Sequence, residues 1–146
     1  MNNLFRAAGV LLPALLLTQP GCSSTSPAAQ PAAHEGPEAI ARTEFTDRVE
    51  NYFEYEPLHA GKPSQVRIHL TDLQDGSPVE KAEVTLSVRP KGTPETVMQT
   101  TAKVGKVTGI YVAELVIPRA GEYDIEFHIK NAKLDERLPL DDFKVE

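Results

Sequence analysis

Hydrophobic and polar residues alternate most regularly between residues 109 and 130, near the end of the chain. Every second position there is apolar on either side of a short break: Tyr111, Ala113, Leu115, Ile117, Tyr123, Ile125, Phe127 and Ile129. A period of two is typical of β-strands that bury one face and expose the other. The stretch therefore predicts two strands joined by a turn, because Pro118 has no N–H to donate and Gly121 tolerates a positive φ.

Two earlier segments, residues 64–71 and 81–88, show the same alternation. Residues 44–55, 95–103 and 134–145 have weaker strand patterns, and turn signals such as Asp75–Gly76 separate the segments. The pattern thus gives seven strands and no long helical segment. We predict an all-β, immunoglobulin-like seven-stranded antiparallel sandwich over residues 43–146. In such sandwiches a buried Tyr at the start of a late strand, here Tyr123, forms a tyrosine corner.

The first 21 residues have the pattern of an export signal. Arg6 precedes an apolar run over residues 7–17 that is too short to cross a bilayer comfortably. Cys22 follows directly, and a small residue before such a cysteine resembles the signal of bacterial lipoproteins. The resemblance implies cleavage before Cys22, a lipid on its sulfur and, with Ser23 in place of Asp, delivery to the outer membrane. The alternative is an ordinary signal peptide with an incidental cysteine.

Residues 22–42 are rich in Ser, Pro and Ala, a composition typical of a disordered tether. We therefore expect a periplasmic domain that is anchored to the membrane through Cys22. The net charge of −6 gives no basic surface for nucleic acid. Because Cys22 is the only cysteine of the chain, no intramolecular disulfide can form.

The histidines are the main candidates for metal binding, since imidazole is a preferred ligand of Cu²⁺ and Zn²⁺. We expect His59, in a predicted turn, to be the best ligand, with Glu54 or Glu56 as its companion. His69 and His128 lie on the polar faces of strands that we expect in different sheets, which argues against a joint site. The favoured alternative is that these histidines and His34 are solvent-exposed and bind no cofactor.

No motif of the chain indicates an enzyme. The serines lack the Gly-Xaa-Ser-Xaa-Gly context of a nucleophile, and no glycine-rich phosphate loop is present. The acidic pairs Asp141–Asp142 and Glu54/Glu56 have the pattern of solvated carboxylates. Partner binding through an edge strand or an exposed face of the sandwich is the remaining class of function.

A family resemblance rests on three sets of residues: the run TDRVENYFEYEPLHAGKPSQVRIHLTDLQDGSPVEKAEVTLSV, the stretch GIYVAELVIPRAGEYDIEFHI at 109–129 and the closing LPLDDFKV. They resemble the N-terminal periplasmic β-sandwich of heavy-metal-efflux membrane-fusion proteins, the adaptors of resistance-nodulation-division pumps. The resemblance implies pump or adaptor components as partners. We expect either a stand-alone accessory lipoprotein or the front end of a longer adaptor. A small periplasmic copper- or zinc-binding carrier and a structural envelope lipoprotein are the alternatives.

Overall fold

The computed structural model describes residues 38–146, all of which belong to one β-sandwich domain. Its strands are β1 (Ile40–Phe45), β2 (Val49–Tyr55), β3 (Pro63–Asp72), β4 (Glu83–Pro90), β5 (Met98–Thr101), β6 (Lys103–Val104), β7 (Ile110–Val116), β8 (Gly121–Lys130) and β9 (Asp135–Val145). The predicted signal peptide, Cys22, His34 and most of the predicted tether lie outside the described residues.

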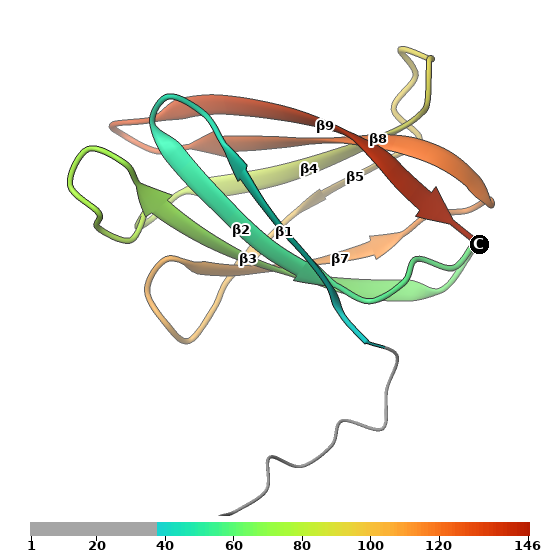
Figure 1. Cartoon of the computed structure of the whole chain (residues 1–146), viewed down its shortest axis with the longest axis horizontal. Coiled ribbons are helices and arrows are strands. Elements are labelled where there is room, and N and C mark those ends of the chain that lie inside the picture. Colours follow the sequence, from blue (N-terminus) through green and yellow to red (C-terminus); the bar gives the residue numbers. More distant parts are fainter. Residues whose placement is uncertain (1–37) are drawn as a thin grey trace, which may run out of the picture. The chain divides into compact units, whose positions relative to one another are not determined.

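The strands form two antiparallel sheets that pack face to face. One sheet has five strands in the order β1-β2-β3-β7-β6, and the other has four in the order β5-β4-β8-β9. Figure 1 shows β8 and β9 on one side of the domain and β3 and β7 on the other. The prediction of an all-β sandwich is therefore confirmed, but the count of seven strands is wrong, since the described residues form nine.

One extra strand arises from a turn inside residues 44–55. The hydroxyl oxygen of Thr46 accepts hydrogen bonds from the N–H groups of Arg48 and Val49, at 3.1 and 3.0 Å. This side chain closes a turn that divides the segment into β1 and β2. β1 also begins at Ile40, so the last residues assigned to the tether belong to the sandwich.

The other extra strand arises where the chain crosses between the sheets. β5 pairs with β4, whereas β6 pairs with β7 of the opposite sheet. Ala102 lies between them and is buried, and its N–H donates to the carbonyl of Val84 at 2.8 Å. The segment predicted as one strand over residues 95–103 is therefore shared by both layers.

The two strands of the most regular stretch, β7 and β8, are not neighbours in one sheet. β7 pairs with β3 and β6, and β8 pairs with β4 and β9. The faces predicted from alternation are correct, because all eight apolar positions are buried. The turn after Ile117 thus carries the chain from one layer to the other.

Buried tyrosine hydroxyls fix two connections at the edge of the core. The hydroxyl of Tyr123 donates to the carbonyl of Arg119, four residues upstream, at 2.9 Å, as expected for a tyrosine corner. The hydroxyl of Tyr111 donates to the carbonyl of Val79 at 2.8 Å and accepts from the N–H of Ala82 at 3.0 Å. Tyr111 therefore holds the connection between β3 and β4 against the body of the sandwich.

Candidate functional site

The residues predicted to bind metal lie on a strand and in the connection that follows it. Glu54 points outward from β2, where its Oε1 accepts a 2.8 Å hydrogen bond from the hydroxyl of Tyr52 and its Oε2 lies 3.8 Å from Nη1 of Arg67. His59 and Glu56 are exposed in the connection between β2 and β3. Residues 38–146 contain no group of three or more His, Cys, Asp or Glu side chains that could hold a metal ion. Metal binding by His59 stays a prediction.

His69 and His128 lie in opposite sheets, as predicted, but both are partly buried and contact neighbouring side chains. The ring of His69, on β3, makes an edge contact with Tyr52, with 5.3 Å between ring centroids. Its Nε2 is buried and has no hydrogen-bond partner among the described residues. On β8, Nε2 of His128 lies 2.7 Å from Oδ1 of Asp135. Both histidines are therefore engaged by neighbouring side chains.

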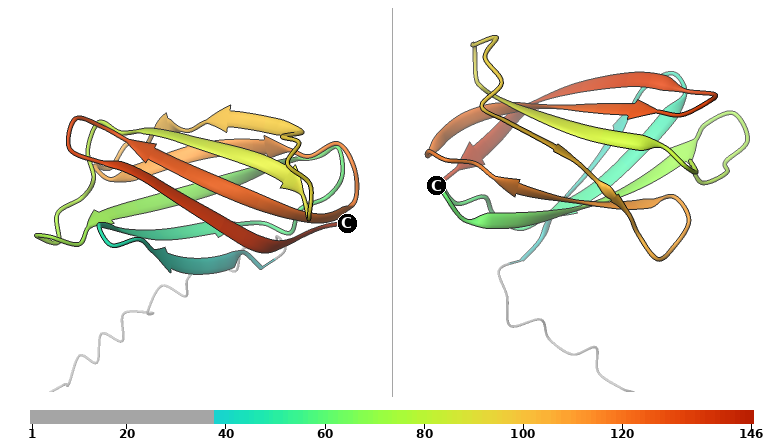
Figure 2. Two further views of the ribbon diagram at one scale, coloured as in Figure 1. Left: turned by 90° about the horizontal axis from the view of Figure 1, so that it is seen from above. Right: turned by 180° about the vertical axis from the view of Figure 1, so that it is seen from behind.

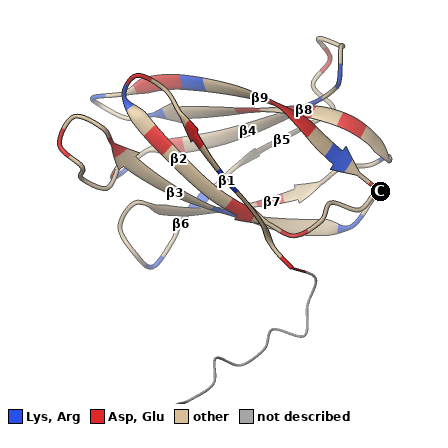
Figure 3. Ribbon diagram, in the orientation of Figure 1, with Lys and Arg blue, Asp and Glu red and all other residues tan. Residues whose placement is uncertain are grey.

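The outer face of the four-stranded sheet is charged, and its charges are largely paired. The carboxylate of Glu126 on β8 forms ion pairs with Arg89, at 3.0 Å, and with Arg137, at 2.8 Å. Lys91 lies 2.8 Å from Asp142. Figure 3 shows basic and acidic residues side by side along β8 and β9. Because the charges satisfy one another, this face offers few free groups to a ligand.

The pKa of Asp135 provides a test of this paired face. The hydrogen bond from His128 and then the one from Lys130 lower the pKa of the Asp135 carboxyl below its ordinary value. A lowered carboxyl pKa favours the folded state above the ordinary pKa, and this contribution is lost as the pH falls through the folded-state pKa. His128→Ala is therefore expected to raise the pKa of Asp135 in an NMR titration. Thr85→Ala, which changes the cross-strand neighbour of His128, should leave it unchanged. An unchanged pKa in His128→Ala would contradict the pairing.

The outer face of the five-stranded sheet has a different character. The strand register places Tyr52, His69 and Ile110 in one row across β2, β3 and β7. Phe45 on β1 (59 % exposed) and Val116 on β7 (42 %) add large apolar side chains to this outer face. The exposed Ile40 and Val104 belong to the same sheet, but they pair with the buried Tyr55 and Tyr111 and therefore lie on the core-facing side of its two edge strands. An exposed apolar and aromatic surface of this kind is typical of contact with another macromolecule.

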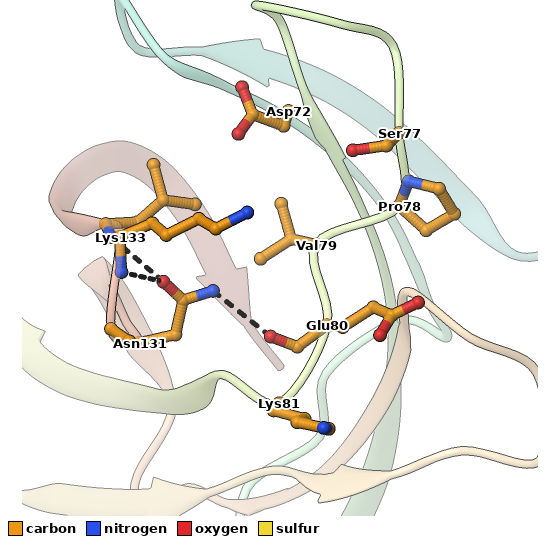
Figure 4. Close-up of a pocket in the computed structure, with 10 residues that line it drawn as sticks. Asp72, Ser77, Pro78, Val79, Glu80, Lys81, Asn131 and Lys133 are labelled. Carbon is orange, nitrogen blue, oxygen red and sulfur yellow. Dashed lines mark hydrogen bonds between the residues drawn. The ribbon is translucent and has the colours of Figure 1, made fainter.

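A pocket of about 360 Å³ lies at one end of the domain, between the β3–β4 connection and the β8–β9 turn (Figure 4). The side chain of Asn131 joins its walls, since Nδ2 donates to the carbonyl of Glu80 and Oδ1 accepts from the N–H groups of Lys133 and Leu134. The carboxylate of Asp72 lies 3.6 Å from Nη2 of Arg48. The side chains of Asn131 and Asp72 thus hold the loops around the pocket together.

No helix among residues 38–146 is long and apolar enough to span a membrane. A family model described as YtkA-like matches residues 46–128 of the 146. The chain belongs to the YtkA-like family. The YtkA-like match begins at the turn before β2 and ends within β8, so β1 and β9 lie outside it. Neither a curated protein nor a solved structure matches the chain. The YtkA-like match does not bear on heavy-metal efflux, and the resemblance to efflux adaptors stays a prediction.

Two features of this YtkA-like domain were missed by reading the sequence. The row of Tyr52, His69 and Ile110 depends on the register of three strands that are distant in sequence. Arg42, which was assigned to the tether, lies 4.8 Å from the ring of Phe143 and donates to the carbonyl of Asp141 at 3.0 Å. Arg42 thus joins β1 of one sheet to β9 of the other, a long-range contact that no local pattern signals.

Proposed function

We propose that this YtkA-like protein is a non-catalytic envelope lipoprotein that acts by protein interaction, as an accessory module of a heavy-metal efflux system. The observation that carries the proposal is the contrast between the two outer faces. The outer face of the four-stranded sheet presents paired charges, whereas that of the five-stranded sheet presents the apolar and aromatic side chains of Phe45, Tyr52, Ile110, Val112 and Val116.

The five-stranded sheet has the composition that protein interfaces favour. Aromatic residues are enriched at interfaces, because they bury a large area and lose little conformational entropy. Tyr52 and Phe45 are partly or largely exposed on this sheet, and Ile110 and Val112 add apolar area on β7. We expect a partner to dock here, with Arg67 and Glu54 contributing polar contacts at the centre of the face.

The proposed address rests on the first 42 residues of the sequence. A lipid on the sulfur of Cys22 contributes about 0.8 kcal/mol of membrane affinity for each buried CH₂ group. The Ser-, Pro- and Ala-rich segment that follows would let the domain turn freely near the membrane surface. A pump or adaptor component in the same envelope is the partner that the sequence resemblance suggests.

The test compares interaction with metal binding in the full chain. A tagged protein, expressed in its own host, is expected to retain an efflux adaptor or pump component through purification, and Cys22→Ser is expected to move it from the membrane to the soluble fraction. Calorimetric titration with Cu²⁺ and Zn²⁺ is expected to give no binding heat. Micromolar binding that His59→Ala abolishes would instead identify a metal carrier, and a Cys22→Ser variant that stays in the membrane would contradict the anchor.

A further inference from the structure

Among residues 38–146, the two sheets have four edge strands, and β1 is the least protected of them. Natural sandwiches protect edges with short strands, prolines, lysines or bulges, because an open edge pairs with other chains. β5 and β6 have only four and two residues. β9 contains Pro139 and Lys144, a shift of register opposite β8, and Asp142 with a φ of 64°.

β1 has none of these protections. Its six residues, IARTEF, include no proline or lysine, and it pairs with β2 in unbroken register. Phe45 and Ile40, at its two ends, are 59 % and 42 % exposed, and Thr43 at its centre is exposed as well. In Figure 2 β1 runs along the margin of the domain. Its one protective feature is the inward direction of Arg42 and Glu44.

We infer that β1 pairs antiparallel with β1 of a second copy of this chain, centred on Thr43, so that two five-stranded sheets form one continuous sheet. The inference goes beyond the proposed function and does not depend on it.

The backbone geometry of β1 fixes which groups are available. The N–H of Thr46 donates to the carbonyl of Val49 at 2.9 Å, which closes the β1–β2 hairpin. In an antiparallel pair, hydrogen-bonded and non-hydrogen-bonded residues alternate along the strand. Counting back from Thr46, the N–H and C=O groups of Ala41, Thr43 and Phe45 point away from β2. These groups are the ones that a further strand would bind.

Pairing about Thr43 makes use of all these groups. Thr43 then faces its own copy, and Ala41 faces Phe45 of the second copy, so that the large aromatic ring lies beside a small side chain. The same register sets Arg42 opposite Glu44 of the other chain, in a non-hydrogen-bonded position where side chains are close. Oppositely charged residues directly across from each other stabilise such pairs.

The ion pair inside each chain is compatible with this arrangement. Nε and Nη2 of Arg42 donate to Oε1 of Glu44 in the same chain, at 3.1 and 2.7 Å. Among the described residues, Oε2 of Glu44 has no hydrogen bond, so it can accept one from the second copy. This charge complementarity of β1 with itself favours a second copy over the strand of another protein.

The test measures the mass of the full chain in detergent solution by light scattering. The wild-type protein is expected to have the mass of two copies at high concentration. Thr43→Pro is expected to be monomeric, because it removes an N–H that the sandwich itself does not use and a proline is tolerated at such an edge position. Thr43→Val, which keeps the N–H and the branched shape, is expected to remain dimeric. Thermal unfolding of both variants checks that the fold is retained.

A second measurement tests the register. The Cα atoms of facing residues in a hydrogen-bonded antiparallel pair lie about 5.5 Å apart, within the range of Cα–Cα distances that a disulfide spans. Thr43→Cys is expected to form a covalent dimer on mild oxidation, whereas Thr101→Cys, an exposed threonine on the edge strand β5, is expected not to. A monomeric wild type at every concentration, a dimer that survives Thr43→Pro, or equal crosslinking of the two cysteine variants would overturn the inference. A monomer would leave the edge to a strand of another protein.

Discussion

Replacing Phe53 by Ala is expected to lower the free energy of unfolding by about 3–5 kcal/mol. Phe53 is fully buried at the centre of the aromatic core. Its ring centroid lies 4.9 Å from that of Phe127 in the opposite sheet and 6.0 Å from that of Tyr55. The loss has two parts, the transfer free energy of the ring and the cavity that remains between the sheets.

Urea denaturation of the full chain measures this effect. Tyr52→Ala is the matched control, since Tyr52 is the next residue of β2 but points to the outer face. We expect the control to lose much less stability, because substitutions on a surface usually change it by about 0.5 kcal/mol or less. A loss below about 1 kcal/mol for Phe53→Ala would contradict the position of the core.

Tyr111→Phe is expected to lower the free energy of unfolding by about 2–4 kcal/mol, although it removes a single oxygen atom. The hydroxyl of Tyr111 donates a hydrogen bond to the carbonyl of Val79 and accepts one from the N–H of Ala82, and all three residues are buried. Without it, a carbonyl and an N–H lose their partner in the interior, and each unpaired buried group costs about 1–3 kcal/mol. Because these groups lie in the β3–β4 connection, the wall of the pocket should also loosen.

Tyr123→Phe provides the comparison for this prediction. The hydroxyl of Tyr123 makes one hydrogen bond, to the carbonyl of Arg119, and the pair is only partly buried. We expect a loss of about 1 kcal/mol, the usual contribution of one hydrogen bond. Differential scanning calorimetry should show the larger fall in Tm for Tyr111→Phe, since 1 kcal/mol corresponds to roughly 4–8 °C in a domain of this size. Equal shifts in the two variants would contradict the role given to Tyr111.

The faces of the strands could be predicted from the sequence because alternation depends only on neighbouring residues. The buried positions of β7 and β8 follow directly from it. The number of strands could not be predicted, because the turn that separates β1 from β2 depends on one side chain, Thr46. The sheet to which each strand belongs depends on contacts between distant segments.

The surroundings of Glu54, a predicted metal ligand, show the same limit. Glu54 and His59 are close in sequence, but Glu54 lies on a strand and points to the outer face. The register of β2 and β3 places Arg67 opposite Glu54, and that arginine contacts the carboxylate. The pairing of β2 with β3 therefore gives the Glu54 carboxylate a contact with Arg67 that the sequence alone does not indicate.

The proposed function depends on the contrast between the outer faces of the two sheets, and photo-crosslinking in intact cells tests this contrast most directly. A photoreactive amino acid is placed at Val112, on the outer face of the five-stranded sheet, or at Thr85, on that of the four-stranded sheet. We predict light-dependent crosslinks to a second protein from Val112 and none from Thr85. Crosslinks from Thr85 alone, or from neither position, would contradict a function that depends on the five-stranded sheet.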